Sequence, residues 1–316
     1  MNNVLFDINK KPYSVQFLYF LLLLLLSYSI FSLLQVLILL LAGYNLAGIN
    51  NLVENIDSQN IGLLKVLQLI TTIGVFIVPA LAFSFLKSGK ATGYIPLTLP
   101  LSTRSVLLAS MVTISALPLM SFFMELNQSV SLPSFLKDVE LWMRDMEGNA
   151  EKLTLAFLKM DSPLDLMLNI LIVALLPAIG EELLFRGCLQ QLLIEWTKKP
   201  HLAIFIAAAL FSAIHFQFLG FIPRMLIGAF LGYLFYWSGN LWYAIIGHFV
   251  NNALQVVGYY FTQGTNSNAD LKAIDSLPPS SILLGTAIFS GTLYLFYKNF
   301  LREKTPDETL ELNRLD

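Results

Sequence analysis

Long apolar stretches alternate with short polar connections along the whole chain. A helix needs ~20 residues to cross the hydrocarbon core of a membrane, and eight stretches reach or approach that length. Their approximate bounds predict helices over residues 15–42, 63–86, 105–124, 164–196, 202–219, 222–237, 241–261 and 281–300. The stretch 222–237 is predicted to be the shortest of these helices. The pattern therefore predicts an all-α fold, a polytopic membrane bundle of about eight transmembrane helices.

Two parts of this pattern are irregular. Within the stretch 164–196, Pro177 lacks an N–H and leaves the Val173 carbonyl without its helical partner, so we expect a loosened helix there. The connection 126–163 carries charges of both signs together with apolar residues such as Trp142. That mixture is typical either of a helix on the outer membrane surface or of a solvated loop, and both readings stay open.

Composition agrees with the membrane pattern and excludes other classes of protein. Of the 316 residues, 56% are hydrophobic and only 13% are charged, which does not suit a soluble surface. The formal net charge of -2 gives no basic field for binding nucleic acid, so no nucleic-acid partner is expected. The single cysteine, Cys188, excludes an internal disulfide framework and a zinc site built from several cysteines.

The first apolar stretch is far longer than the apolar region of a signal peptide, so we expect it to remain as a transmembrane helix. Residues 1–316 are then predicted to form a single integral membrane domain, with the lipid bilayer as one partner. Lysines and arginines gather in connections that eight spans would place on one side of the membrane, which the positive-inside rule makes cytoplasmic. These residues are Lys10, Lys11, Lys87, Lys90, Arg104, Lys198, Lys199, Lys298, Arg302 and Lys304. Both termini are therefore predicted to be cytoplasmic, and the acidic residues Glu54, Asp57, Asp270 and Asp275 are predicted to lie outside.

Three charged side chains lie inside the fourth apolar stretch: Glu181, Glu182 and Arg186. One charge at the centre of a spanning helix costs ~2.5–3.5 kcal/mol on insertion scales, so such residues need partners or a function. Glu182 and Arg186 are one helical turn apart and are expected to pair. Glu181 is left without a local partner, and we expect its carboxyl group to exchange protons near neutral pH.

Two histidines follow in later apolar stretches, and both are expected to lie in helices. If the turn between the fourth and fifth helices centres on Lys198, Glu181 lies 17 residues before it and His215 lies 17 residues after it. Antiparallel helices then bring the two to a similar depth. His248 has Asn252 one turn after it. A lone intramembrane histidine is often only a hydrogen-bonding link between helices, but together these four residues provide a general base, a polarising group and oxyanion donors.

Two nearby residues are expected to have structural roles. Cys188 shares a helix face with Glu181 but has no evident basic neighbour that would activate its thiol. Arg224 follows Pro223 at the start of an apolar stretch and is expected to anchor that helix at the outer membrane interface.

Three short motifs connect these residues to a known family. GEELLFRG (residues 180–187) fits E-E-x-x-x-R, FSAIH (211–215) fits F-x-x-x-H, and HFVNN (248–252) fits H-x-x-x-N. In order and spacing they resemble the CAAX-protease and bacteriocin-processing family, also called Abi, of intramembrane endopeptidases, which includes CAAX prenyl protease 2. The resemblance covers residues 164–261 approximately and implies a protease core in that segment of a helical membrane bundle. Because many relatives are bacterial, a bacterial plasma membrane is the expected location.

The resemblance also implies a role for each matched position. Glu181 would be the catalytic base, and His215 would help it to hold and polarise the attacking water or would share a metal with it. His248 and Asn252 would stabilise the oxyanion, unless His248 is a metal ligand instead. The matched positions with supporting roles are Glu182, Arg186 and Phe211.

The cofactor stays open between two possibilities. Glu181, His215 and His248 are the ligand types of a catalytic zinc site, so one zinc ion is one possibility. The same residues with Asn252 can also activate water without a metal, and the chain lacks the H-E-x-x-H zinc motif.

The leading functional hypothesis is an intramembrane endopeptidase that cleaves a peptide or protein substrate near the cytoplasmic side of the membrane. One alternative is a non-catalytic membrane scaffold or bacteriocin-immunity protein that retains the same residues. A transporter is a third hypothesis, in which Glu181 would carry protons, but the sequence shows neither inverted repeats nor paired broken helices.

Overall fold

The structure is a computed structural model that describes residues 8–45, 60–263 and 278–301. Every regular element in these residues is helical, which confirms the predicted all-α class. Several charged residues used in the orientation argument lie outside the described residues: Glu54, Asp57, Asp270, Asp275, Arg302 and Lys304.

Each predicted apolar stretch contains a helix or a run of joined helices. The N-terminal half has α1 (Tyr13–Leu41), α3 (Ile61–Thr71), the π-helical turn η3 (Thr72–Ile77), α4 (Val78–Ser88), α5 (Thr103–Gln128) and α6 (Lys137–Leu158). The long fourth helix is built from α7 (Pro163–Asn169), η5 (Ile170–Leu175), α8 (Leu176–Leu184), η6 (Phe185–Gln190) and α9 (Gln191–Thr197). The C-terminal part has α10 (Pro200–Ala213), the 3-10 turn η7 (Phe218–Gly220), α11 (Phe221–Ser238), α12 (Leu241–Thr262) and α14 (Pro279–Leu301).

Six segments among the described residues are long and apolar enough to cross a membrane. They are Tyr13–Leu41, Ile61–Ser88, Thr103–Gln128, Pro163–Thr197, Phe218–Ser238 and Ser280–Leu301. The polytopic membrane bundle is thereby confirmed, whereas a count of eight spans is not. The shortest helix of the eight predicted is α10 with 14 residues, so the prediction for 222–237 was wrong: α11 has 18 residues.

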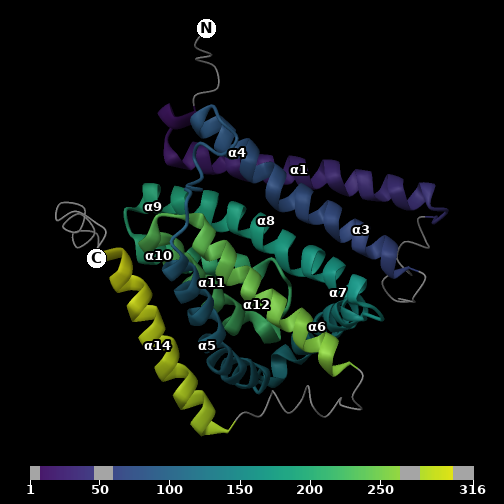
Figure 1. Cartoon of the computed structure of the whole chain (residues 1–316). Coiled ribbons are helices and arrows are strands. Elements are labelled where there is room, and N and C mark those ends of the chain that lie inside the picture. The colour runs from purple at the N-terminus through teal and green to yellow at the C-terminus, as the bar shows by residue number, and fades with distance from the viewer. Residues whose placement is uncertain (1–7, 46–59, 264–277, 302–316) are drawn as a thin grey trace.

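The helices that bear the motifs occupy the centre of the bundle (Figure 1). In this arrangement α12 packs against α5, α8 and α11, while α10 packs against α11. The pair α1 and α4 covers one flank, and α14 lies along α5 on the other. Residues of α8 and α12 therefore face one another inside the protein.

The fourth helix is not a regular α-helix. The π-helical turn η5 ends two residues before Pro177 and contains Val173, where the sequence predicted a loosened helix. A second π-helical turn, η6, contains Arg186. Such turns change which face a residue presents, and they occur frequently at functional sites.

The connection 126–163 contains a helix, α6, so the helical reading of that segment is confirmed. Its helix lies beside α7, far from the turn between α9 and α10 (Figure 1). Trp142 is exposed on α6, and Phe135 is exposed just before its first residue. The same helix packs against the short turn η7.

The fifth helix ends earlier than predicted, and this changes the setting of His215. The predicted helix 202–219 stops at Ala213, so His215 lies in a turn rather than in a helix. Phe216 has a φ of 53°, a left-handed conformation that a helix cannot continue through. The apolar run continues beyond this point, which is why composition alone suggested a longer helix.

The two ends of the bundle can be tested as the two sides of the membrane. Lys199, in the turn after α9, and Lys152, on α6, are exposed at opposite ends of the bundle. The positive-inside rule places the Lys199 end in the cytoplasm. In a Cys188→Ser background, a membrane-impermeant maleimide added to cells should therefore label Lys152→Cys and leave Lys199→Cys unlabelled. Permeabilised cells provide the control, because both cysteines should then react. Efficient labelling of Lys199→Cys in intact cells would contradict the predicted orientation.

Candidate active site

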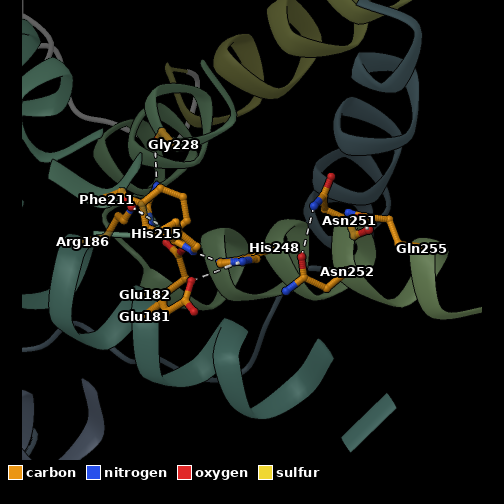
Figure 2. Close-up of polar contacts among 10 residues, drawn as sticks. All are labelled: Glu181, Glu182, Arg186, Phe211, His215, Gly228, His248, Asn251, Asn252 and Gln255. Atoms are coloured by element: carbon orange, nitrogen blue, oxygen red, sulfur yellow. Dashed lines mark hydrogen bonds and ion pairs between the residues drawn. The ribbon is translucent and has the colours of Figure 1, made fainter. Parts of the chain in front are cut away.

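The structure brings the three motifs together from different helices (Figure 2). Glu181 and Glu182 come from α8, and Arg186 comes from η6. The third motif contributes His248 and Asn252 from α12, while the second contributes Phe211, near the end of α10, and His215, in the turn after it. The site is therefore an interhelical cluster inside the bundle.

A buried ion pair forms the base of this cluster. Arg186 Nη1 donates to Glu182 Oε1 at 2.7 Å, and the two side chains are 1% and 0% exposed. The same guanidinium donates through Nη2 to the Gly228 carbonyl on α11 at 2.8 Å and lies over the Phe211 ring, 4.7 Å from its centroid. The pairing predicted from the helical spacing is confirmed, and Arg186 also joins α10 and α11 to the fourth helix.

Glu182 also orients His248. The Nδ1 atom of His248 lies 2.8 Å from Glu182 Oε1, and its Nε2 atom lies 3.7 Å from Glu181 Oε2. Because a carboxylate accepts hydrogen bonds, Nδ1 is the donor in the first contact. The contact with Glu182 therefore turns Nε2 toward Glu181, a role for Glu182 that the helical spacing did not show. The other oxygen of Glu182, Oε2, has no hydrogen-bond partner among the described residues.

The early end of α10 orients His215. The backbone N–H of His215 donates to the Ser212 carbonyl at 3.3 Å. In a continuing α-helix this N–H would instead donate to the Phe211 carbonyl, which here lacks that backbone bond. The Phe211 carbonyl instead accepts from His215 Nδ1 at 2.8 Å. A carbonyl only accepts, so Nδ1 carries the proton, and Nε2 is the acceptor nitrogen of the neutral ring.

Phe211 packs against both histidines. Its ring centroid lies 5.1 Å from the His215 ring and 5.8 Å from the His248 ring, in both cases edge to face. Phe185 packs on it in the same manner at 5.3 Å. The phenylalanine of the second motif thus holds the two imidazoles on a common apolar support.

Asn252 lies one turn beyond His248 on α12 (Figure 2). Its Oδ1 accepts from Asn251 Nδ2 at 3.1 Å, and Gln255 Nε2 donates to the Asn251 carbonyl at 3.2 Å. The Nδ2 group of Asn252 remains able to donate to a substrate. Its role in oxyanion stabilisation stays a prediction.

The predicted metal ligands do not form a ligand set in this arrangement. Among the residues that the structure describes, no three His, Cys, Asp or Glu side chains lie close enough together to hold a metal ion. The zinc alternative for Glu181, His215 and His248 stays a prediction, and the chemistry below uses these side chains directly.

Arg224 contacts the turn that carries His215, while its expected role as an anchor at the membrane interface stays a prediction. Its Nη2 atom donates to Gln217 Oε1 at 2.6 Å. Its charge acts electrostatically on Glu181 and on His215. The available sequence signal was an arginine inside the apolar segment that directly follows the second motif.

Comparison with known proteins agrees with the site. A polytopic helical membrane protein with this Glu, Arg and His cluster has the parts of an intramembrane hydrolase. Residues 163–254 match the family of Rce1-like proteins, described as type II CAAX prenyl endopeptidases. The match spans the segment that bears the three motifs, which confirms the resemblance drawn from those motifs.

One curated relative is similar to part of this chain. The chain is 34% identical over 90 residues to the uncharacterized protein YpbD of Bacillus subtilis, and the match covers 27% of this chain and 43% of that protein. No solved structure shows a significant match. The chain thus matches less than half of YpbD, whose printed name assigns no activity.

The buried ion pair gives a stability prediction. Glu182→Gln leaves Arg186 without its carboxylate, and breaking a buried pair in this way costs about 3–5 kcal/mol. Glu181→Gln removes a carboxylate that has no arginine partner, so it should leave stability unchanged or increase it. Unfolding of the purified protein in detergent, followed by heat or denaturant, measures both variants.

A double replacement is the control for this prediction. Glu182→Gln combined with Arg186→Met removes both charges, so it should recover part of the lost stability. Equal stability of Glu182→Gln and Glu181→Gln would show that the Glu182 and Arg186 pair does not support the fold.

Proposed function

We propose that this protein is an intramembrane endopeptidase that hydrolyses a peptide bond with water activated by Glu181. The observation that carries the proposal is the buried pair of Glu181 Oε2 and His248 Nε2, 3.7 Å apart on two different helices. The match of the motif-bearing segment to the Rce1-like family supports protease chemistry, and the six apolar segments support a membrane setting.

The charges of the cluster leave Glu181 available as the base. Arg186 binds Glu182, not Glu181, so the Glu181 carboxylate is not neutralised by a direct ion pair with that arginine. The separation of 3.7 Å between Glu181 Oε2 and His248 Nε2 is too long for a direct hydrogen bond. It allows a reacting group beside the two atoms to contact both of them. In the proposal, Glu181 and the acceptor Nε2 of His215 hold the attacking water.

The proposed reaction transfers one proton through Glu181. The water oxygen attacks the carbonyl carbon of the substrate while one water proton passes to the Glu181 carboxylate. The carbonyl oxygen becomes an oxyanion, which accepts a hydrogen bond from Asn252 Nδ2. The proposal gives His248 the imidazolium form, which carries a proton on both nitrogens, so that Nδ1 donates to Glu182 and Nε2 donates to the oxyanion. When the tetrahedral intermediate collapses, the C–N bond breaks and the leaving amine takes the proton from Glu181. Glu181 is then a carboxylate again.

We further infer that cleavage takes place near the cytoplasmic side. His248 lies eight residues after Asn240, which is about 12 Å along a helix that rises ~1.5 Å per residue. The turn at Asn240 lies at the same end of the bundle as the turn that carries Lys198 and Lys199 (Figure 1). The positive-inside rule makes that end cytoplasmic.

Substrates can be found by comparing the C-termini of membrane proteins in three strains. These strains express the unaltered protein, express Glu181→Gln, or lack the protein. Shortened C-termini should appear only with the unaltered protein. With a peptide spanning such a cleavage site, purified Glu181→Gln in lipid vesicles should cleave ~10²–10⁴ times more slowly, because that is the usual contribution of a general base.

Asp145→Asn is the matched control, since it neutralises an exposed carboxylate on α6, outside the site. It should cleave at the unaltered rate. If Glu181→Gln at equal membrane abundance produces the same C-termini as the unaltered protein, the protease hypothesis is wrong for this chain. The non-catalytic scaffold or immunity reading would then replace it.

We also propose that the reaction proceeds without a metal, because the three predicted ligands are not gathered as a ligand set. Protein freed of metal, and verified by elemental analysis, should retain its cleavage rate. The unaltered protein and His215→Ala should contain the same low amount of zinc. The proposal is contradicted if the unaltered protein contains about one equivalent of zinc and His215→Ala does not, and if the metal-free protein regains its cleavage activity only when zinc is added. Inhibition by a chelator alone does not decide the question, because chelators also disturb membrane proteins.

A further inference from the structure

The turn that carries His215, residues 214–220, is held by side chains from three helices. Asn127 on α5 donates through Nδ2 to the Phe218 carbonyl at 2.9 Å. On α6, Glu147 accepts the Leu219 N–H at 3.2 Å. From α11, Arg224 reaches back to the same turn. The turn between α10 and α11 is thus held by contacts from α5, α6 and α11.

Arg224 contacts this turn through the side chain and the backbone carbonyl of Gln217. Its Nη2 donates to Gln217 Oε1 at 2.6 Å, and its Nη1 approaches the Gln217 carbonyl at 3.4 Å. Gly220 makes room for the guanidinium, because a Cβ there would lie only 3.1 Å from Arg224 Nη2. The planar fork of an arginine can contact a side chain and a main-chain oxygen together, which the ammonium group of a lysine does with less directional control.

The α6 side of the turn complements this contact. The Trp142 ring lies 5.2 Å from the Phe218 ring. Glu147 is half-buried here, and its burial raises its pKa, while the Leu219 N–H and the nearby Arg224 charge act in the opposite direction. Glu147 and Arg224 thus lie on two sides of the same turn and attract each other.

The backbone of the turn needs such support. Phe216 holds a left-handed φ of 53°, which a residue with a Cβ keeps only where its surroundings determine it. After the Phe216 N–H, which bonds to the Ala213 carbonyl, the turn leaves the hydrogen-bond ladder of α10. The position of His215 therefore depends on contacts made by the residues that follow it.

We propose that Arg224 is a positioning residue for the hydrolysis, acting through Gln217 on the turn that carries His215. This inference rests on the proposed function, since it assigns Arg224 to the same site. By fixing Gln217, Arg224 keeps His215 Nε2 in place against the water that Glu181 activates. Arg224 does not itself touch the reacting atoms in this proposal.

Kinetics with a peptide that spans an identified cleavage site test the proposal. Arg224→Lys keeps the charge but loses the fork, so it should lower kcat ~10- to 100-fold, the effect of a small misplacement of a catalytic group. KM should stay within about twofold, because the change affects the reacting geometry rather than substrate binding. Gln217→Ala should act similarly. The combined variant should be no slower than Arg224→Lys alone, because both changes break one contact.

Arg144→Lys is the matched control, since Arg144 is paired with Glu140 of its own helix, α6. It should leave kcat unchanged. Unaltered kcat in Arg224→Lys, or additive effects of the Arg224 and Gln217 changes, would overturn the assignment.

Hydrogen exchange measured by mass spectrometry gives a readout that needs no cleavage. Exchange of the amides in residues 214–220 should be faster in Arg224→Lys than in the unaltered protein and unchanged in Glu181→Gln. If the unaltered protein cleaves its substrate but Arg224→Lys exchanges the amides of residues 214–220 at the unaltered rate, the role assigned to Arg224 is overturned and the proposed function stands. If exchange responds but the unaltered protein cleaves nothing, the proposed function has failed, and the catalytic role of Arg224 fails with it.

Discussion

The burial of an ion pair inside an apolar helix bundle is the constraint on which the site depends. Glu182 and Arg186 are both removed from solvent, and each buried ion loses several kcal/mol of hydration that only close partners can offset. The partners come from other helices: His248 from α12, the Gly228 carbonyl from α11 and the Phe211 ring from α10. Satisfying two charges therefore fixes the relative register of the segments that carry all three motifs.

The same constraint separates the two adjacent glutamates into different roles. Glu182 is committed to Arg186 and His248 through a single oxygen, Oε1. Glu181 faces Nε2 of the same histidine without a hydrogen bond to it. One carboxylate thus supports the structure, and the other is the one to which the proposed function assigns proton transfer. The π-helical turn η6 begins at Phe185, three residues after Glu182, so the helix changes its winding where Arg186 must reach α11.

Local patterns in the sequence predicted what local geometry determines. The apolar stretches identified the helices, and the spacing of Glu182 and Arg186 predicted their ion pair because residues four apart share one helix face. The bond from Glu182 to His248 joins residues 66 positions apart and depends on how α8 and α12 are packed. The contact of Arg224 with Gln217 was not predicted, because an arginine near a helix end has the same local pattern whichever way its side chain points. Its direction is set by Gln217 and Gly220, through tertiary packing.

The setting of His215 shows why an apolar run is an incomplete guide to a membrane site. In a continuous helix, the Phe211 carbonyl would accept the His215 backbone N–H, and the imidazole would have to find another partner. Here α10 ends at Ala213, the His215 N–H bonds to Ser212, and the Phe211 carbonyl is released to accept Nδ1. Ending the helix thus converts a backbone acceptor into a group that fixes the imidazole and leaves Nε2 for chemistry. Such non-helical backbone is tolerated at membrane depth only where protein surrounds it, and the contacts from Asn127, Glu147 and Arg224 provide that surrounding.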